Sequence, residues 1–177
     1  VERFLELARK VRAVAKQQEG EAHGYPPLIE KCYPPYVLAE LDALKQAWES
    51  LSDGGPASEL IWLAITAILR VCSPVGTAQW QYVLPKKKKV NPLAPLMAYE
   101  IQIHNMATDM GIRQQQLSGD AAIVYQEDAR VCESVPECWA NLVLTSPPYT
   151  NNYDYADATR LEMSFWGEVE SWGDLHH

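Results

Sequence analysis

The feature that most constrains this chain is an apolar run that ends in two prolines, Leu142-Val143-Leu144-Thr145-Ser146-Pro147-Pro148-Tyr149. The run at residues 141–145 is short and apolar, which predicts a strand. Each proline fixes its own φ and pushes the residue before it into extended geometry, so we expect a rigid backbone after the strand. Ligands of open α/β sheets bind outside the carboxyl ends of strands, which makes this segment a candidate ligand site.

A strand followed by Thr-Ser-Pro-Pro-Tyr resembles motif IV of the S-adenosylmethionine-dependent amino-group DNA methyltransferases, which modify cytosine N4 or adenine N6. The resemblance extends upstream through residues 122–130 and downstream through residues 151–155, and it covers residues 121–168 in all. It implies an α/β fold with a partial Rossmann-like methyltransferase sheet, S-adenosylmethionine as the methyl donor and DNA as the substrate. Serine at position 146 resembles the cytosine-N4 branch more than the adenine-N6 branch.

The residues of this motif suit chemistry on an exocyclic amino group. Such a group is a weak nucleophile because its lone pair is delocalised into the ring, and acceptors that hold its hydrogens prepare it for attack. The Ser146 hydroxyl and the Pro147 carbonyl are the candidate acceptors. The base must be flipped out of the duplex and stacked on an aromatic side chain, for which Tyr149 is the candidate. The predicted catalytic set is therefore Ser146, Pro147, Pro148 and Tyr149.

Residues on either side of the motif are candidates for binding the cofactor and the substrate. The resemblance implies that Asp128 and Thr145 contact the methyl donor, while Asp128 is equally compatible with capping a short helix at residues 129–134. Asn151, Asn152 and Tyr153 are candidates for lining the base or cofactor pocket, and the alternative is a solvated loop. The charged residues of the helix expected next, Asp157, Arg160 and Glu162, indicate an exposed face.

A second copy of the tripeptide provides an internal control. Tyr33-Pro34-Pro35-Tyr36 has nearly the same letters, but no apolar strand precedes it and a helical pattern follows. This copy predicts a helix that begins near its prolines. For residues 146–149 the corresponding alternative is a strand that ends in a Pro-Pro turn with Tyr149 packed on it.

The chain lacks the aromatic-x-Gly-x-Gly turn with which the resembled family holds its cofactor. The only glycine cluster, Gly54-Gly55, lies between two helical patterns and predicts a linker turn. The chain begins with Val1 and ends with two histidines typical of a tag remnant, so both ends look cut. We therefore expect a fragment of a methyltransferase whose glycine turn lies upstream.

Charge gives a mixed indication about nucleic acid. A net charge of -8 argues against binding over the whole surface. A strand-like segment at residues 78–85 is followed by a lysine run that predicts a basic turn able to follow a phosphate backbone. A solvated loop is the alternative for this run, which consists of Lys86, Lys87, Lys88 and Lys89.

The chain divides into two predicted parts. Residues 1–117 are mostly helical, with helices expected at residues 4–14, 36–51, 59–72 and 91–116, and they are a possible insertion or target-recognition part. Residues 118–177 are expected to carry the partial α/β methyltransferase core, with strands at 121–125 and 141–145. Ser58 is a candidate cap for the third helix, and His104 is expected to be structural.

Composition limits the surroundings of the protein. No run is long and apolar enough to span a membrane. The four cysteines show no metal-binding spacing and indicate reduced thiols in the cytoplasm, and no metal site is expected. The remainder of the methyltransferase or a restriction enzyme is a possible protein partner, and the oligomeric state is left open.

Three functions remain in play. The first is methylation of a flipped DNA base, with cytosine N4 favoured over adenine N6. The second is a non-catalytic helical module for nucleic-acid binding or assembly that retains a degenerate site. The third is methyl transfer to RNA or to a protein amide nitrogen, which related Pro-Pro-Tyr segments perform in similar families.

Overall fold

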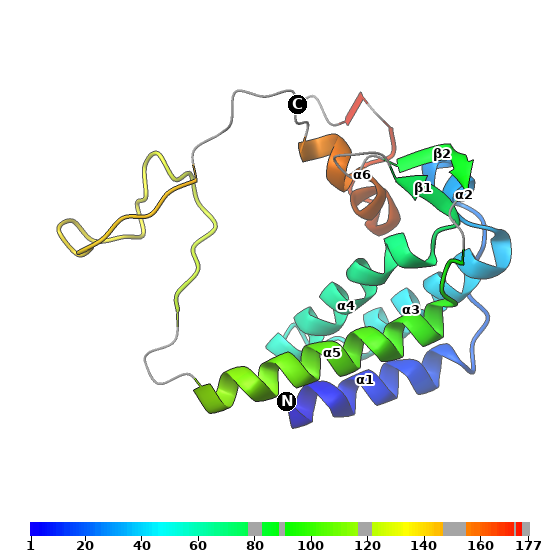
Figure 1. Cartoon of the computed structure of the whole chain (residues 1–177), viewed down its shortest axis with the longest axis horizontal. Coiled ribbons are helices and arrows are strands. Elements are labelled where there is room, and N and C mark those ends of the chain that lie inside the picture. The colour runs from blue at the N-terminus through cyan, green and yellow to red at the C-terminus, as the bar shows by residue number, and fades with distance from the viewer. Residues whose placement is uncertain (78–82, 89–90, 117–121, 147–154, 172, 175–177) are drawn as a thin grey trace. The chain divides into compact units, whose positions relative to one another are not determined.

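The computed structural model describes residues 1–77, 83–88, 91–116, 122–146, 155–171 and 173–174. The helices are α1 (Glu2–Ala15), α2 (Pro27–Cys32), α3 (Pro35–Leu51), α4 (Pro56–Cys72), α5 (Pro95–Gln116) and α6 (Tyr155–Trp166), as Figure 1 shows. Two compact units are present. The helical unit comprises Val1–Gln115 and Tyr153–His177, and the loop unit comprises Gln116–Asn152.

Proline sets the start of four of these helices. Pro27, Pro35, Pro56 and Pro95 are each the first residue of their helix. At this position the missing N–H has no intrahelical partner to lose, and the fixed φ already suits a helix. The helix predicted after Tyr33-Pro34-Pro35-Tyr36 is confirmed, because Pro34 is the N-cap residue of α3.

The four helices predicted in the first part of the chain are confirmed with shifted boundaries, and α2 was not predicted. Ser58 does not cap α4. It is fully buried in the first turn of that helix, and its hydroxyl lies 2.6 Å from the Ser52 hydroxyl. Gly55 occupies the N-cap position instead. Because α4 starts at Pro56, Ser58 already lies within the helix. Its hydroxyl connects α4 to Ser52, the C-cap residue of α3.

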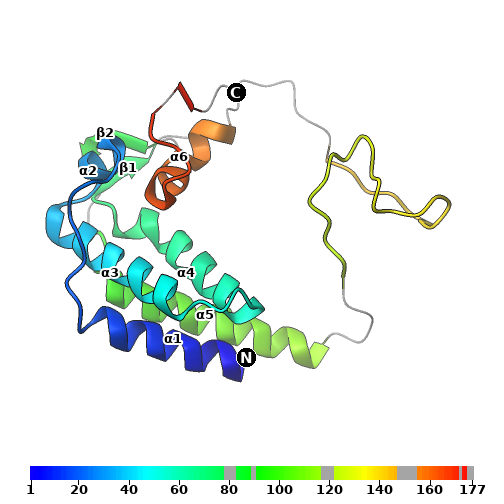
Figure 2. The same cartoon turned by 180° about the vertical axis from the view of Figure 1, so that it is seen from behind.

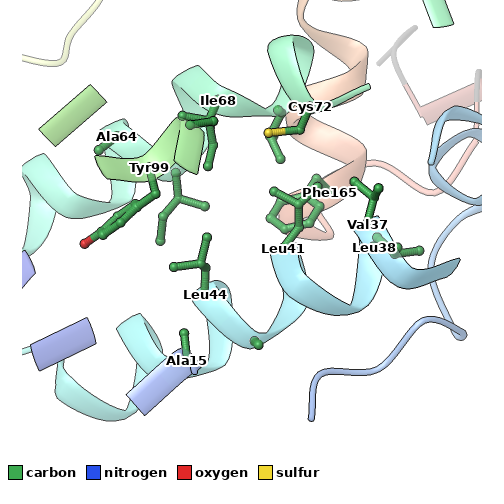
Figure 3. Packing of buried hydrophobic residues seen from close by; sticks show 14 of the residues in the cluster. Ala15, Val37, Leu38, Leu41, Leu44, Ala64, Ile68, Cys72, Tyr99 and Phe165 are labelled. Atoms are coloured by element: carbon green, nitrogen blue, oxygen red, sulfur yellow. The ribbon is translucent and has the colours of Figure 1, made fainter. Parts of the chain in front are cut away.

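The core of the helical unit is formed by one apolar face from each of several helices. On α1 the buried residues Phe4, Ala8, Val11 and Ala15 recur at a spacing of three or four, the repeat of a helix face. They pack with α3 and α4 around Leu41, Leu44, Ile65 and Ile68, and Tyr99 and Phe165 add aromatic rings from α5 and α6 (Figure 3). Burial of each large side chain contributes roughly 1.5–3 kcal/mol, so this face-to-face packing is the main source of the unit's stability.

A short antiparallel pair is the sheet structure that the described residues contain. Strand β1 (Val75–Thr77) pairs with β2 (Val83–Lys88), with Gly76 opposite Leu84 and Lys88 opposite Val75. The prediction of a basic turn at the lysines was wrong for Lys86, Lys87 and Lys88, because they belong to β2 itself. Lys89 lies outside the described residues.

The predicted α/β fold with a partial Rossmann-like sheet is wrong, because the structure is mostly helical. Residues 122–126 and 142–146 have no regular secondary structure, and no backbone hydrogen bond joins these two described segments. Their apolar side chains are exposed, with 90% of Val124 and 86% of Leu144 accessible to solvent. An apolar sequence favours a strand, but a strand forms only when a neighbouring strand pairs with its backbone.

The predicted short helix at residues 129–134 is also absent. Turns occupy residues 129–131 and 133–134 instead. In the parts of the chain described here, no helix combines the length and apolar character needed to cross a membrane.

Candidate functional site

The motif residues that the structure describes lie in an extended, solvent-exposed segment of the loop unit. Thr145 and Ser146 are exposed and belong to no helix or strand of the described residues. The Ser146 hydroxyl is therefore accessible to an approaching amino group. The rest of the predicted catalytic set, Pro147, Pro148 and Tyr149, lies outside the described residues, as do Asn151, Asn152 and Tyr153.

Asp128 holds a turn in the same unit. Its carboxylate accepts hydrogen bonds from the Arg130 backbone N–H at 2.9 Å and from Arg130 Nε at 2.9 Å. The side-chain hydrogen bond from Arg130 lowers the pKa of the Asp128 carboxyl below its ordinary value. The Asp128 carbonyl accepts from the N–H groups of Val131 and Cys132, so the residue closes a turn in the manner of a cap. The carboxylate remains exposed and anionic at neutral pH.

The predicted site residues are not all collected in one described site. No hydrogen bond or ion pair joins Asp128 to Ser146 within the described loop unit. Lys86, Lys87 and Lys88 belong to the helical unit, where Lys88 is exposed. Within the described residues, no three His, Cys, Asp or Glu side chains converge as metal ligands. His104 is exposed on α5, not buried in the core.

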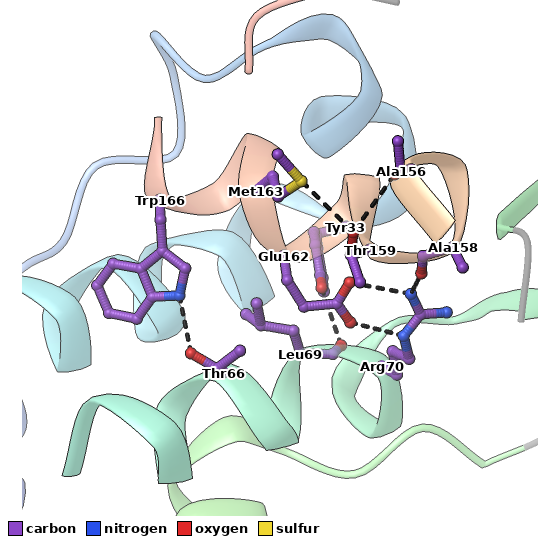
Figure 4. Close-up of polar contacts among 10 residues, drawn as sticks. All are labelled: Tyr33, Thr66, Leu69, Arg70, Ala156, Ala158, Thr159, Glu162, Met163 and Trp166. Carbon is purple, nitrogen blue, oxygen red and sulfur yellow. Dashed lines mark hydrogen bonds and ion pairs between the residues drawn. The ribbon is translucent and has the colours of Figure 1, made fainter. Parts of the chain in front are cut away.

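The helix that follows the motif is held firmly by the helical unit. Arg70 of α4 donates from Nε to Glu162 Oε1 at 2.6 Å and from Nη2 to Glu162 Oε2 at 2.9 Å (Figure 4). Arg70 Nη2 also donates to the Ala158 carbonyl at 2.5 Å. Because α6 begins at Tyr155, this paired contact fixes the chain directly after residues 147–154.

The predicted exposed charged face on α6 was wrong. The side chains of Arg70 and Glu162 are only 19% and 18% exposed. Asp157 and Arg160 are also partly buried and form an ion pair at 3.6 Å. A charged helix face becomes partly buried when the neighbouring helix offers an opposite charge, and that partner is 92 residues away in sequence.

A second contact between α6 and the helical unit is aromatic. Trp166 Nε1 donates to Thr66 Oγ1 at 2.9 Å (Figure 4), and the rings of Tyr25 and Phe165 stack with centroids 5.5 Å apart. Lys45 Nζ lies 5.3 Å from the centre of the Tyr25 ring and 5.6 Å from that of Phe165. Cation–π attraction and aromatic packing thus join α3, α6 and the segment before α2.

A buried carboxylate supports this aromatic contact. Asp42 accepts a hydrogen bond from the Tyr25 hydroxyl, from the Glu21 N–H at 2.6 Å and from Gln46 Nε2 at 2.5 Å. Burial, together with the hydrogen bond to Asp42, raises the pKa of Tyr25 well above its ordinary value. The tyrosine therefore stays a neutral donor. Sequence reasoning missed Asp42, Lys45 and Arg70, and only the four-residue spacing of Asp42 and Gln46 was a visible sign.

The described residues provide little for the methyl donor that the resemblance implies. Of the two residues predicted to contact it, Asp128 already binds Arg130 through its carboxylate, and Thr145 is an exposed side chain outside any helix or strand. Gly20 does not provide space for a cofactor, because a Cβ there would lie 2.1 Å from the Ala39 carbonyl oxygen. The missing side chain instead allows the backbone at Gly20 to pack closely on α3.

Comparison of the chain with protein-family models, curated proteins and solved structures found no match.

Proposed function

We propose that this protein takes part in methyl transfer from S-adenosylmethionine to an exocyclic amino group of a flipped DNA base, with cytosine N4 favoured over adenine N6. The observation that carries the proposal is the sequence Leu142-Val143-Leu144-Thr145-Ser146-Pro147-Pro148-Tyr149, with the described Ser146 side chain open to solvent.

The chemistry assigned to the chain concerns the amino group. The Ser146 hydroxyl and the Pro147 carbonyl accept hydrogen bonds from the two N–H bonds of this group, which directs the nitrogen lone pair out of the ring plane. On accepting a methyl group the amino nitrogen would lose one of its two protons to solvent. When bound, S-adenosylmethionine supplies the electrophilic methyl group. Tyr149 stacks on the flipped base and keeps it in the site.

The first experiment tests whether the methyl donor binds. The full chain is titrated by calorimetry with S-adenosylmethionine and then with S-adenosylhomocysteine. Micromolar affinity, about -8 kcal/mol, supports methyl transfer by this chain. Absence of binding to both compounds contradicts it and favours the non-catalytic helical module, for which salt-sensitive DNA binding without a donor is the expected behaviour.

The second experiment measures transfer of a labelled methyl group to unmethylated duplex DNA, to RNA and to protein. We expect label in DNA, recovered as N4-methylcytosine after hydrolysis. Loss of one positioned hydrogen-bonding group, as in Ser146→Ala, lowers the rate about 100-fold. Loss of base stacking in Tyr149→Ala lowers it at least about tenfold.

The chain offers a matched control in its other Pro-Pro-Tyr segment. Tyr36 is 72% exposed and follows two prolines at the start of α3. Tyr36→Ala therefore removes the same side chain from the same local sequence and leaves the rate unchanged. An equal loss of rate in Tyr36→Ala and Tyr149→Ala would contradict the assigned role of Tyr149. Label in RNA or protein with none in duplex DNA would instead favour the third function.

The compartment proposed for this chemistry is the cytoplasm. Cys32, Cys72, Cys132 and Cys138 form no disulfide, which suits a reducing environment.

A further inference from the structure

A small cleft between α1 and α5 carries two arginines. It has a volume of about 220 Å³ and is lined by Arg9, Arg12, Glu100 and His104 over an apolar floor. Figures 1 and 2 both show α1 beside α5, and the Tyr99 hydroxyl joins them by donating to the Ala8 carbonyl at 3.3 Å. Ala8, Tyr99 and Ile103 are buried, so the cleft has a firm floor, while Arg9 and His104 are exposed at its rim.

Arg12, which lines this cleft, has one buried donor without an acceptor among the described residues. Its Nη2 forms an ion pair with Glu100, but its Nε is buried and has no acceptor among the described residues. A buried donor without an acceptor costs roughly 1–3 kcal/mol, and more when the group is charged. The buried Nε is itself closed to solvent, so an oxyanion in the cleft meets the rest of the guanidinium, whose forked N–H groups match phosphate oxygens.

Charge and size indicate the kind of ligand. Two arginines and one glutamate line the cleft, so its formal charge favours an anion. Residues 1–16 carry five basic and two acidic side chains, in contrast to the net charge of -8 for the whole chain. A volume of about 220 Å³ is smaller than a typical small-molecule site and suits a single phosphate group. The exposed rim leaves room for a polymer that carries such groups.

We propose that the α1/α5 cleft binds a backbone phosphate of duplex DNA through Arg9 and Arg12, with Glu100 as a built-in competitor for Arg12. The choice of DNA as the source of the phosphate rests on the proposed function. Binding of a phosphate group in the cleft does not rest on the proposed function, since it needs neither the methyl donor nor residues 146–149. The cleft contact is independent of base sequence, because phosphate contacts position a protein without reading bases.

The test is the affinity of the full chain for a fluorescent DNA duplex without a methyl donor, measured by anisotropy over about 50–200 mM salt. Arg12→Gln and Arg9→Gln each weaken binding by about tenfold at low salt and reduce the slope of log affinity against log salt by about one. Glu100→Gln strengthens binding several-fold because the competing carboxylate is removed. These opposite signs separate a ligand site from an ion pair that only stabilises the fold, and thermal unfolding of every variant checks folding.

Lys10→Gln is the matched control. It removes the same charge from α1, but Lys10 pairs with Glu6 at 2.7 Å and does not line the cleft. A smaller loss in Lys10→Gln than in Arg9→Gln and Arg12→Gln supports the cleft. Equal losses in all three, or no gain in Glu100→Gln, overturn it. Equal competition by inorganic phosphate and duplex DNA, or preference for RNA, overturns the choice of DNA. Loss of methyl transfer alone, with these variant effects intact, overturns only the proposed function.

Discussion

Leu161 and Leu144 are the same residue type in opposite surroundings. Leu161 on α6 is 1% exposed in the core of the helical unit, whereas Leu144 in the loop unit is 86% exposed. Leu161 stands between Arg160 and Glu162, whereas Leu144 ends an apolar run, so local apolarity does not predict which of the two is buried. A helix satisfies its own backbone hydrogen bonds and then has one face to bury. An extended segment must find a partner for its backbone first, and the described residues give residues 142–146 none.

The largest expected contrast between these regions comes from one substitution made twice. Leu161→Ala lowers the free energy of unfolding by about 2–5 kcal/mol, because it leaves a cavity between α6 and the bundle. Leu144→Ala changes it by less than about 0.5 kcal/mol, since that side chain is already in water. Urea denaturation followed by circular dichroism measures both values. If Leu144→Ala costs as much as Leu161→Ala, residues 142–146 are buried in the folded protein.

The arginine ion pairs of the two units are expected to differ in the same way in their contribution to stability. Arg70→Met removes the donors to Glu162 and to the Ala158 carbonyl in a contact that is mostly shielded from solvent. We expect a loss of roughly 2–3 kcal/mol, because Glu162 is left charged and poorly solvated. Arg130→Met breaks the exposed pair with Asp128 and gives no measurable loss.

Denaturation of both variants tests this expectation, and a second substitution tests its cause. Adding Glu162→Gln to Arg70→Met restores part of the lost stability if the unpaired carboxylate is responsible. No recovery in the double variant would indicate that Arg70 acts mainly through packing or through its contact with the Ala158 carbonyl.

The smallest expected effect appears in alkaline solution. Burial raises the pKa of the Cys32 thiol from 9.0 to about 11, and burial raises the pKa values of Tyr33 and Tyr99 as well. The unfolded chain releases these protons first, so stability is lost as the pH rises, between about pH 9 and 11 for Cys32 and above about pH 10 for the two tyrosines. Cys32 contributes roughly 2 kcal/mol of that decline.

Chemical denaturation at a series of pH values from about 8 to 11 measures the decline. Cys32→Ala makes it shallower, and Cys132→Ala is the control because its thiol is exposed. An unchanged slope in Cys32→Ala would mean that Cys32 is accessible to water in the folded protein.

Sequence reasoning located four helices of the first part of the chain because their signals are local. Apolar residues at helical spacing indicated α1, α3, α4 and α5, and the prolines at 34 and 35 marked the start of α3. It also separated the two Pro-Pro-Tyr segments, and the one at Pro34 and Pro35 does begin a helix. The site was located only as far as its residue types, since the described part of the motif ends at Ser146.

Sequence reasoning failed where the outcome depended on distant partners. Residues 121–125 and 141–145 were expected to be strands, but strand formation requires backbone pairing that local apolarity cannot ensure. Arg70 and Glu162 lie 92 positions apart, and neither residue alone indicates that the other will approach it. The same is true of the α1/α5 cleft, where Arg12 and Glu100 meet only because two helices pack.

The sequence by itself determined four helices of the first part of the chain, the proline start of α3 and the resemblance of residues 142–149 to an amino-group methyltransferase motif. Tertiary structure decided that Arg70 holds α6, that Lys45 lies against aromatic rings, and that a buried donor of Arg12 finds no acceptor in the described part of the chain. The physical reason is range: helical hydrogen bonds and proline geometry act within a few residues, whereas burial and ion pairing depend on which distant groups packing brings together.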